Sequence, residues 1–306
     1  MDAARVIATG LCFPEGPVAL GDGSVALVEI ERQTVSRVRP DGTVEVLARP
    51  GGGPNGMAVG PDGALYVCNN GGFAWRHEHG MLRPVLQGPG YSGGRIERVD
   101  MGTGEVRVLY DQCGGHGLRG PNDIVFDAVG GFYFTDLGKT RPRDRDQGGL
   151  YYALADGSRI VEVAHPILTP NGVGLSPDGQ VVYVAETETA RLWAFDLDAP
   201  GVARKQPFPS PHGGRLVIGL GGFARFDSLA VDAAGNICVA TLLSGCVSVV
   251  APDGRLLRQV PTGDMMTTNI CFGGPDLRTA YVTLSGKGQL VSLDWPEPGL
   301  RLAHAA

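Results

Sequence analysis

Six polar positions recur along the chain, each at the start of an apolar run of residues. They are Glu15, Asn55, Asn122, Asn171, Asp227 and Asn269. Carboxylate and amide oxygens are hard ligands, of the kind that Ca²⁺, Mg²⁺ and Mn²⁺ prefer. If the fold brings them together, two carboxylates and several neutral oxygens would hold one divalent cation and leave coordination positions open for water and a substrate.

The segments that carry these positions share one pattern: a polar residue, an apolar strand, a turn that usually contains Asp-Gly or Gly-Gly, and a second apolar strand. They span residues 14–30, 54–70, 121–136, 170–186, 226–241 and 267–283. Successive polar positions are 40 to 67 residues apart, close to the spacing that four short strands and their turns require. Weaker hairpins such as 34–48 and 94–110 lie between most segments, and helical periodicity is absent. We therefore predict an all-β fold, a six-bladed β-propeller of four-stranded antiparallel blades, with residues 1–306 as a single domain.

The predicted ring explains how positions far apart in sequence can meet. In each blade the innermost strand starts at the same mouth of the central channel, so all six polar residues converge there. We expect residues 5–10 to close the ring by pairing with residues 289–295. An open two-sheet sandwich is the alternative fold, but it leaves the six polar positions unexplained. The alternative for each side chain is a hydrogen bond to nearby loop backbone, a frequent role of Asn, Asp and Glu at strand starts.

Composition narrows the functional classes. The 306 residues include 48 glycines and 22 prolines, which suits many tight turns, and the net charge of −6 argues against a nucleic acid or an anionic membrane as partner. Six scattered cysteines favour reduced thiols, and neither a signal peptide nor a membrane-spanning run is apparent. We expect a cytoplasmic protein, a monomer or small homo-oligomer, that acts on a small molecule.

Long connections are predicted on the same side of the ring as the polar positions. They comprise residues 71–93, 111–120, 137–148 and 200–225. Because function often resides in long loops on a rigid scaffold, their aromatic and basic side chains are candidates for substrate contact. These candidates are Trp75, His77, His79, Tyr91, His116, Arg119 and His212.

At the six positions the sequence resembles the senescence marker protein (regucalcin)/gluconolactonase/LRE-like family of metal-dependent lactonases. The resemblance covers essentially the whole chain. It is carried by EGPV (15–18), PND (121–123), PNG (170–172), and the segments 226–241 and 267–274. Their order and spacing, more than any one of them, make the match specific.

The resemblance implies roles for individual residues. Glu15, Asn171 and Asp227 would hold the cation, expected to be Ca²⁺ with Mn²⁺, Mg²⁺ or Zn²⁺ as alternatives, and Asp227 would also act as general base. Asn122 would bind substrate or water beside the metal. The further substrate-binding candidates are chosen for their place at the mouth or in the long loops, apart from the resemblance: Asn55, Arg119, His116, Trp75 and Asn269. Two departures concern the substrate: Gly120 stands where related proteins often carry Arg, and Ala19 where a Trp commonly follows EGPV.

The resulting hypothesis is hydrolysis of a small lactone, in which a cation polarises the carbonyl and a general base activates water. The sequence has no GxSxG motif, which argues against a covalent serine route. Two alternatives stay open. One is a metal-assisted isomerase, cyclase or lyase on the same site, and the other is a propeller that serves as a binding module.

Overall fold

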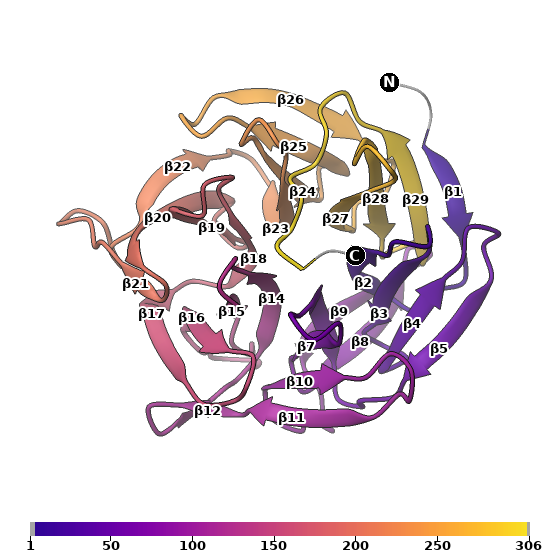
Figure 1. Cartoon of the computed structure of the whole chain (residues 1–306), viewed down its shortest axis with the longest axis horizontal. Coiled ribbons are helices and arrows are strands. Elements are labelled where there is room, and N and C mark those ends of the chain that lie inside the picture. The colour runs from indigo at the N-terminus through magenta and orange to yellow at the C-terminus, as the bar shows by residue number, and fades with distance from the viewer. Residues whose placement is uncertain (1–3, 305–306) are drawn as a thin grey trace.

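A computed structural model describes residues 4–304, and these residues form strands and turns without any helix. Six four-stranded antiparallel blades surround one axis (Figure 1), which confirms the predicted propeller. Blade 1 consists of β2 (Pro14–Ala19), β3 (Val25–Glu29), β4 (Thr34–Val38) and β5 (Val44–Ala48). Blade 2 consists of β6 (Pro54–Val59), β7 (Leu65–Asn69), β10 (Arg95–Val99) and β11 (Val106–Tyr110). Blade 3 consists of β14 (Pro121–Phe126), β15 (Gly131–Asp136), β16 (Gly148–Leu154) and β17 (Ile160–Ile167).

The remaining three blades follow the same order from the axis outwards. Blade 4 consists of β18 (Pro170–Leu175), β19 (Val181–Glu186), β20 (Arg191–Ala199) and β22 (Arg215–Gly219), with β21 (Val202–Ala203) beside β20. Blade 5 consists of β23 (Arg225–Val231), β24 (Ile237–Leu242), β25 (Cys246–Val250) and β26 (Leu256–Pro261). Blade 6 consists of β27 (Thr267–Gly273), β28 (Thr279–Leu284), β29 (Gln289–Asp294) and β1 (Arg5–Ala8). The last blade joins the two ends of the chain, because β1 pairs with β29 and sets Val6 opposite Val291. The predicted ring closure is thereby confirmed.

The apolar core lies between neighbouring blades, where the faces of their sheets pack together. Between blades 2 and 3, for example, the ring of Tyr66 lies 5.0 Å from that of Phe126 and 5.9 Å from that of Phe132. A lone blade would leave both faces in water, so radial stacking is what buries them. The resulting ring is a rigid support for the ends of its inner strands.

The C-terminal segment closes the far end of the channel, opposite the six polar positions. In Figure 1 this yellow segment runs across the centre of the ring. The backbone N–H of Leu300 donates to the carbonyl of Val231, and that of Gly299 to the carbonyl of Leu277. Beneath the segment lies a cavity of about 110 Å³ lined mainly by apolar residues of the inner strands and by Leu300, Leu302 and His304. Sequence reasoning did not anticipate this cover.

Two predicted loops differ from expectation. Residues 71–93 are largely a β-hairpin of β8 (Phe73–Glu78) and β9 (Met81–Gln87), although they do lie on the predicted side. The prediction for 200–225 is wrong in its first part: residues 200–214 join the third and fourth strands of blade 4 and therefore lie at the far side. A small hairpin, β12 (Gln112–Cys113) with β13 (His116–Gly117), occupies 111–120.

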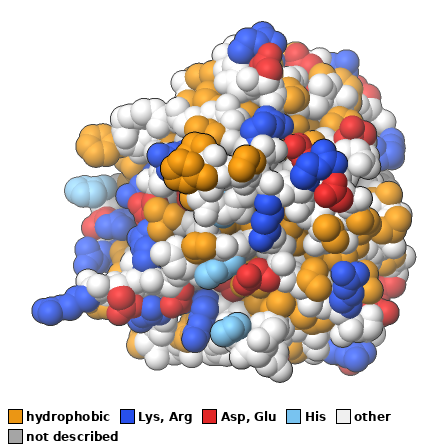
Figure 2. All heavy atoms as spheres, turned by 90° about the vertical axis from the view of Figure 1, so that its left-hand side faces the viewer, with side chains coloured by type: hydrophobic (Ala, Val, Ile, Leu, Met, Phe, Trp, Pro, Cys, Tyr) orange, Lys and Arg blue, Asp and Glu red, His pale blue; other side chains and the backbone are white. Residues whose placement is uncertain are grey.

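The surface of the blades carries charges of both signs. Figure 2 shows the side of the ring with Lys and Arg interspersed among Asp and Glu, and with hydrophobic side chains scattered singly or in small groups. No helix able to cross a membrane occurs in residues 4–304. All six cysteines are unpaired.

Candidate active site

All six polar residues lie at the start of innermost strands and are buried, with exposed fractions of 3% to 7%. Each of these strands has an irregularity in its pairing at or beside the polar residue, as between Glu15 and Val18 or between Pro170 and Val173. A β-bulge re-aims a side chain that the regular pleat would point toward a neighbouring sheet. The six irregularities therefore explain how these residues face the channel.

Glycines next to the polar residues let neighbouring inner strands approach closely. A Cβ on Gly16 would lie 2.5 Å from the carbonyl oxygen of Asn55, and one on Gly56 only 2.3 Å from that of Asn122. A Cβ on Gly172 would lie 2.7 Å from the carbonyl oxygen of Asp227. Only glycine fits where one backbone contacts another in this way. The motifs EGP and PNG thus have a packing reason as well as a chemical one.

The two carboxylates at the mouth are desolvated and lie near each other. Glu15 Oε2 accepts hydrogen bonds from Asn269 Nδ2 at 2.7 Å and from the Gly16 N–H at 2.6 Å. Burial nevertheless raises the pKa of Glu15 to about 7. Burial, together with the charge of Glu15, raises the pKa of Asp227 well above its usual range. Burial disfavours the charged form of a carboxyl group, and a like charge nearby adds to this effect at Asp227.

A third carboxyl group, that of Asp123, adds to the negative charge. It is buried, and burial with the nearby charge of Glu15 raises its pKa to about 8. Its Oδ1 accepts from the Ile124 N–H at 3.0 Å, and it lies toward the apolar half of the channel. Sequence reasoning missed Asp123, although the PND motif that marked Asn122 contains it.

The side-chain amide oxygens of Asn122 and Asn171 are better suited to binding a cation than to accepting hydrogen bonds from the protein. Asn122 Oδ1 is buried and accepts no hydrogen bond from any residue between 4 and 304, and Asn171 Oδ1 accepts only a long one, 3.3 Å, from Ser228 Oγ. Within the same residues, no three His, Cys, Asp or Glu side chains are grouped so that they could bind a metal by themselves. A cation at this mouth would therefore need amide oxygens beside the carboxylates, which is the mixed ligand set that Ca²⁺ accepts.

A cavity of about 170 Å³ lies over these residues, and five of the six line it: Glu15, Asn55, Asn122, Asn171 and Asp227. Asn269 instead borders the far cavity and holds Glu15. The hairpin β8–β9 supplies one wall, with Phe73, Pro84, Val85 and Leu86. The other apolar lining residues are Phe13, Ile30, Leu137, Leu242 and Met266.

A buried lysine that the sequence did not single out fastens this wall. Lys139 Nζ donates to Asn70 Oδ1 at 2.9 Å and to the Gly72 carbonyl at 3.1 Å, and it lies 3.9 Å from the centre of the Phe73 ring. Burial lowers its pKa to about 7, against the attraction of Asp136 and Asp146. A lysine in a loop rich in Arg and Asp carries no sequence signal for burial, which explains the omission.

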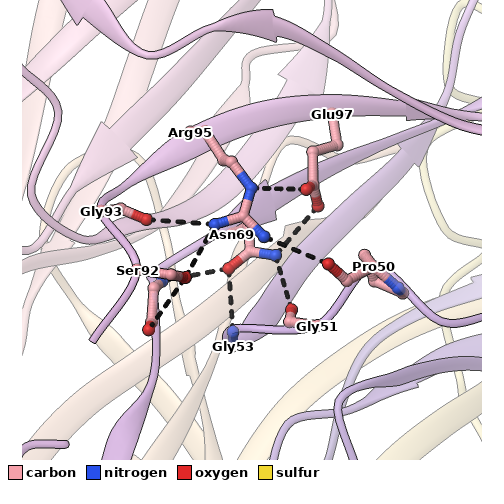
Figure 3. Close-up of polar contacts among 9 residues, drawn as sticks. Pro50, Gly51, Gly53, Asn69, Ser92, Gly93, Arg95 and Glu97 are labelled. Atoms are coloured by element: carbon pink, nitrogen blue, oxygen red, sulfur yellow. Dashed lines mark hydrogen bonds and ion pairs between the residues drawn. The ribbon is translucent and has the colours of Figure 1, made fainter. Parts of the chain in front are cut away.

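A polar network behind the cavity holds both the strand of Asn55 and the base of the hairpin (Figure 3). Asn69 Oδ1 accepts from the N–H groups of Gly53 and Gly71, at 2.8 and 3.0 Å, while Nδ2 donates to the Gly51 carbonyl and to Glu97 Oε2, both at 2.9 Å. Arg95 pairs with Glu97 and donates to Ser92, Gly93 and Pro50. Asn69 thereby uses its full hydrogen-bonding capacity, which fixes the turns on both sides.

The other predicted contact residues lie outside the cavity lining. Trp75 packs behind the wall, 5.2 Å from the Phe13 ring and 6.1 Å from that of Phe73. Arg119 and His116 are exposed and do not line the cavity, and Tyr91 donates to the Arg119 carbonyl at 2.7 Å.

The remaining histidines differ from expectation as well. His77 and His79 border a separate groove beside the hairpin. The expectation for His212 is wrong, because its segment lies at the far side of the ring and its side chain is buried 4.4 Å from the Trp193 ring.

Comparisons with known proteins agree with this fold and indicate a family. Residues 13–286 match the model of the family described as SMP-30/Gluconolactonase/LRE-like region. A gluconolactonase of Zymomonas mobilis is 27% identical over 313 aligned residues, covering 92% of this chain and 78% of that protein, and the lactonase drp35 of Staphylococcus saprophyticus is 29% identical, covering 82% and 68%. The calcium-binding protein regucalcin of Agrobacterium tumefaciens shares the fold, with a TM-score of 0.75 at 21% identity over 98% of both chains. The chain belongs to the SMP-30/gluconolactonase/LRE-like family.

Proposed function

We propose that this protein is a metal-dependent lactonase, which adds water to a small lactone and releases the hydroxycarboxylic acid. The observation that carries the proposal is the pairing of two buried carboxylates, Glu15 and Asp227, with the unpartnered amide oxygen of Asn122 at the floor of one cavity. Relatives named gluconolactonase and lactonase support the reaction class.

The ligands we propose for the cation are Glu15, Asn171 and Asp227. Their oxygens suit a hard divalent ion, and its charge would offset the burial that raises the pKa of both carboxyl groups and the charge of Glu15 that raises that of Asp227 further. Ca²⁺ is the ion we expect. When bound, such an ion supplies Lewis-acid polarisation of an ester carbonyl.

The protein's own groups perform the proton transfers. Asp227, as a carboxylate, accepts a proton from the attacking water, whose oxygen forms a bond to the carbonyl carbon. The ring C–O bond then breaks, and the proton passes from Asp227 to the departing alkoxide oxygen. Asn122 orients the water or the substrate beside Asp227, and the apolar walls exclude bulk water.

The direct test is to strip the protein with a chelator, restore single divalent ions, and follow acid release from a panel of lactones. We expect Ca²⁺ to restore turnover, and Asp227→Asn to lower kcat at least about 100-fold, the scale of general-base catalysis. Asp253→Asn is the control, since Asp253 is an exposed turn residue between β25 and β26. Full activity of the chelated protein or of the Asp227 variant would refute the proposal.

A further inference from the structure

The walls of the cavity differ in character from its floor. Above Glu15 and Asp227, the lining is apolar on the hairpin side, from Phe73 to Leu86, and on the opposite side at Leu242 and Met266. The polar side chains above the floor are Thr140 and Thr187. No Lys, Arg or His side chain of the described chain lines this cavity.

We infer that the preferred substrate is a lactone with an alkyl or aryl substituent, in contrast to a polyhydroxylated sugar lactone; this inference rests on the proposed lactonase function. A sugar lactone carries a hydroxyl group on nearly every ring carbon. Hydroxyl groups that lose water against an apolar wall without gaining a partner weaken binding severely. An alkyl or aryl group gains affinity from the same wall.

The basic side chains near the site are unavailable to sugar hydroxyl groups. Lys139 is engaged by Asn70 and by the Gly72 carbonyl, with the Phe73 ring against its ammonium group. The side chain of Arg119 is exposed and does not line the cavity. The wall therefore offers few polar partners. The buried hydroxyl of Thr187, which has no hydrogen-bond partner among residues 4–304, provides for one polar group of a substrate.

The apolar wall is also held in place before any substrate binds. The Gln87 N–H donates to the Thr140 carbonyl at 2.8 Å, and the Leu82 N–H donates to the Gly286 carbonyl at 3.3 Å. These contacts tie β9 to the loops of blades 3 and 6, and Lys139 ties the start of β8. A preorganised apolar surface loses little conformational entropy on binding, so added methylene groups increase affinity directly.

The test is a series of δ-lactones of increasing length, from δ-valerolactone through δ-hexalactone and δ-octalactone to δ-decalactone, against δ-gluconolactone, with the Ca²⁺-loaded enzyme. We expect kcat/KM to rise roughly fourfold per methylene, from about 0.8 kcal/mol each, until the wall is covered. The best alkyl lactone should exceed δ-gluconolactone by at least about 100-fold. A flat series, or a preference for δ-gluconolactone, would overturn the inference and leave the lactonase function intact. Failure to hydrolyse any lactone would overturn both this inference and the proposed lactonase function.

Variants of the wall assign the effect to this cavity. Val85→Thr is nearly isosteric, and Leu86→Asn puts an amide on the same wall. Both should flatten the dependence of kcat/KM on chain length, because each puts a polar group on the wall that the longer alkyl chains contact. Leu256→Asn on the outer strand β26 is the control, because Leu256 is exposed. An unchanged chain-length dependence in folded Val85 and Leu86 variants, verified by thermal melting, would place the preference elsewhere and overturn the inference.

Discussion

The ammonium group of Lys139 lies 3.9 Å from the centre of the Phe73 ring, and this contact joins a loop of blade 3 to the hairpin of blade 2. Phe73 lines the cavity, whereas Lys139 is 1% exposed and does not. A buried cation held by two oxygen acceptors and an aromatic face is a positioning device. The shape of the cavity wall therefore depends on a residue outside it.

Lys139→Met should loosen the hairpin without touching the carboxylates. It removes two hydrogen bonds and the contact of the charge with Phe73, so we expect a KM for alkyl lactones several-fold higher and a kcat within about twofold of the original. Steady-state kinetics on δ-decalactone separates the two constants. A fall in kcat at unchanged KM would assign Lys139 to the chemistry and contradict the positioning role.

The same lysine gives stability a distinct dependence on pH. Its pKa is lowered to about 7 in the folded protein from an ordinary 10.5, so between these values the unfolded chain binds more protons than the native one. The contribution of Lys139 to the free energy of unfolding should therefore rise with pH across this window, on the order of 1 kcal/mol per pH unit. The buried carboxyl groups titrate equally in both proteins, so urea unfolding at pH 7, 8 and 9 should show the stability of the original protein rising relative to that of Lys139→Met. Parallel curves would mean that Lys139 is not desolvated as described.

Cation binding should compete with protons at the mouth of the channel. Burial raises the pKa of Glu15 to about 7 and that of Asp227 well above its usual range, so the metal-free native state binds more protons than the unfolded chain from about pH 4.5 through 7. The stability of the metal-free protein should therefore fall as pH rises through that window, while Ca²⁺ affinity should increase. Calorimetric titration at pH 5.5, 6.5 and 7.5 checks the affinity. A Ca²⁺ affinity independent of pH would contradict binding at these carboxylates.

Glu15→Gln should abolish stabilisation by the cation while leaving the fold intact. The amide keeps the size of the side chain and removes both a negative ligand and the repulsion with Asp227, so the metal-free variant should melt at or above the temperature of the metal-free original. Added Ca²⁺ should raise the melting temperature of the original protein but not that of the variant. Glu45→Gln on the outer strand β5 is the control for loss of one carboxylate. An equal Ca²⁺ response in Glu15→Gln would exclude Glu15 as a ligand.

The elements nearest the axis were the most predictable from sequence. A residue such as Asn171 or Asp227 must be polar, must start an inner strand, and must sit where neighbouring backbones touch, so the same short pattern returns in every blade. Ring closure was predicted for residues 5–10, and within them Arg5–Ala8 forms the strand that pairs with β29. These constraints are local in sequence and repeated in every blade, so the sequence alone is enough to predict them.

What escaped prediction depends on contacts between distant segments. Lys139 is buried only because the hairpin from another blade covers it, and the C-terminal segment around Leu300 closes the far mouth through contacts with β23. The side on which 200–214 lies depends on whether β20 is the second or third strand of its blade, and the long spacing before β22 concealed that order. Periodicity within a strand contains none of this information.

Asn69→Ala should destabilise the protein although Asn69 lies outside the cavity. It leaves the N–H groups of Gly53 and Gly71 and one oxygen of Glu97 without their partner, and unsatisfied buried groups cost about 1–3 kcal/mol each. We expect a loss of at least about 2 kcal/mol in the free energy of unfolding, measured by urea titration. Arg98→Ala, which removes a partly exposed ion pair with Asp62 in the same blade, should cost less than about 1 kcal/mol. Equal losses in the two variants would mean that the network is dispensable.

Gly172→Ala tests whether the geometry of the floor depends on contact between backbones. The added Cβ would lie 2.7 Å from both the Asp227 carbonyl oxygen and the Leu229 nitrogen, and backbone atoms cannot move aside as a flexible side chain can. The strands of Asn171 and Asp227 must therefore separate, and a misplacement of about 1 Å at a catalytic centre costs about 100-fold in rate. We expect kcat/KM to fall by that order and Ca²⁺ affinity to weaken. Gly221→Ala, where a Cβ meets nothing within 4 Å, should leave both unchanged. Retention of full activity in Gly172→Ala would show that Asn171 and Asp227 do not need their present separation, and the assignment of both to one cation would then lose its geometric basis.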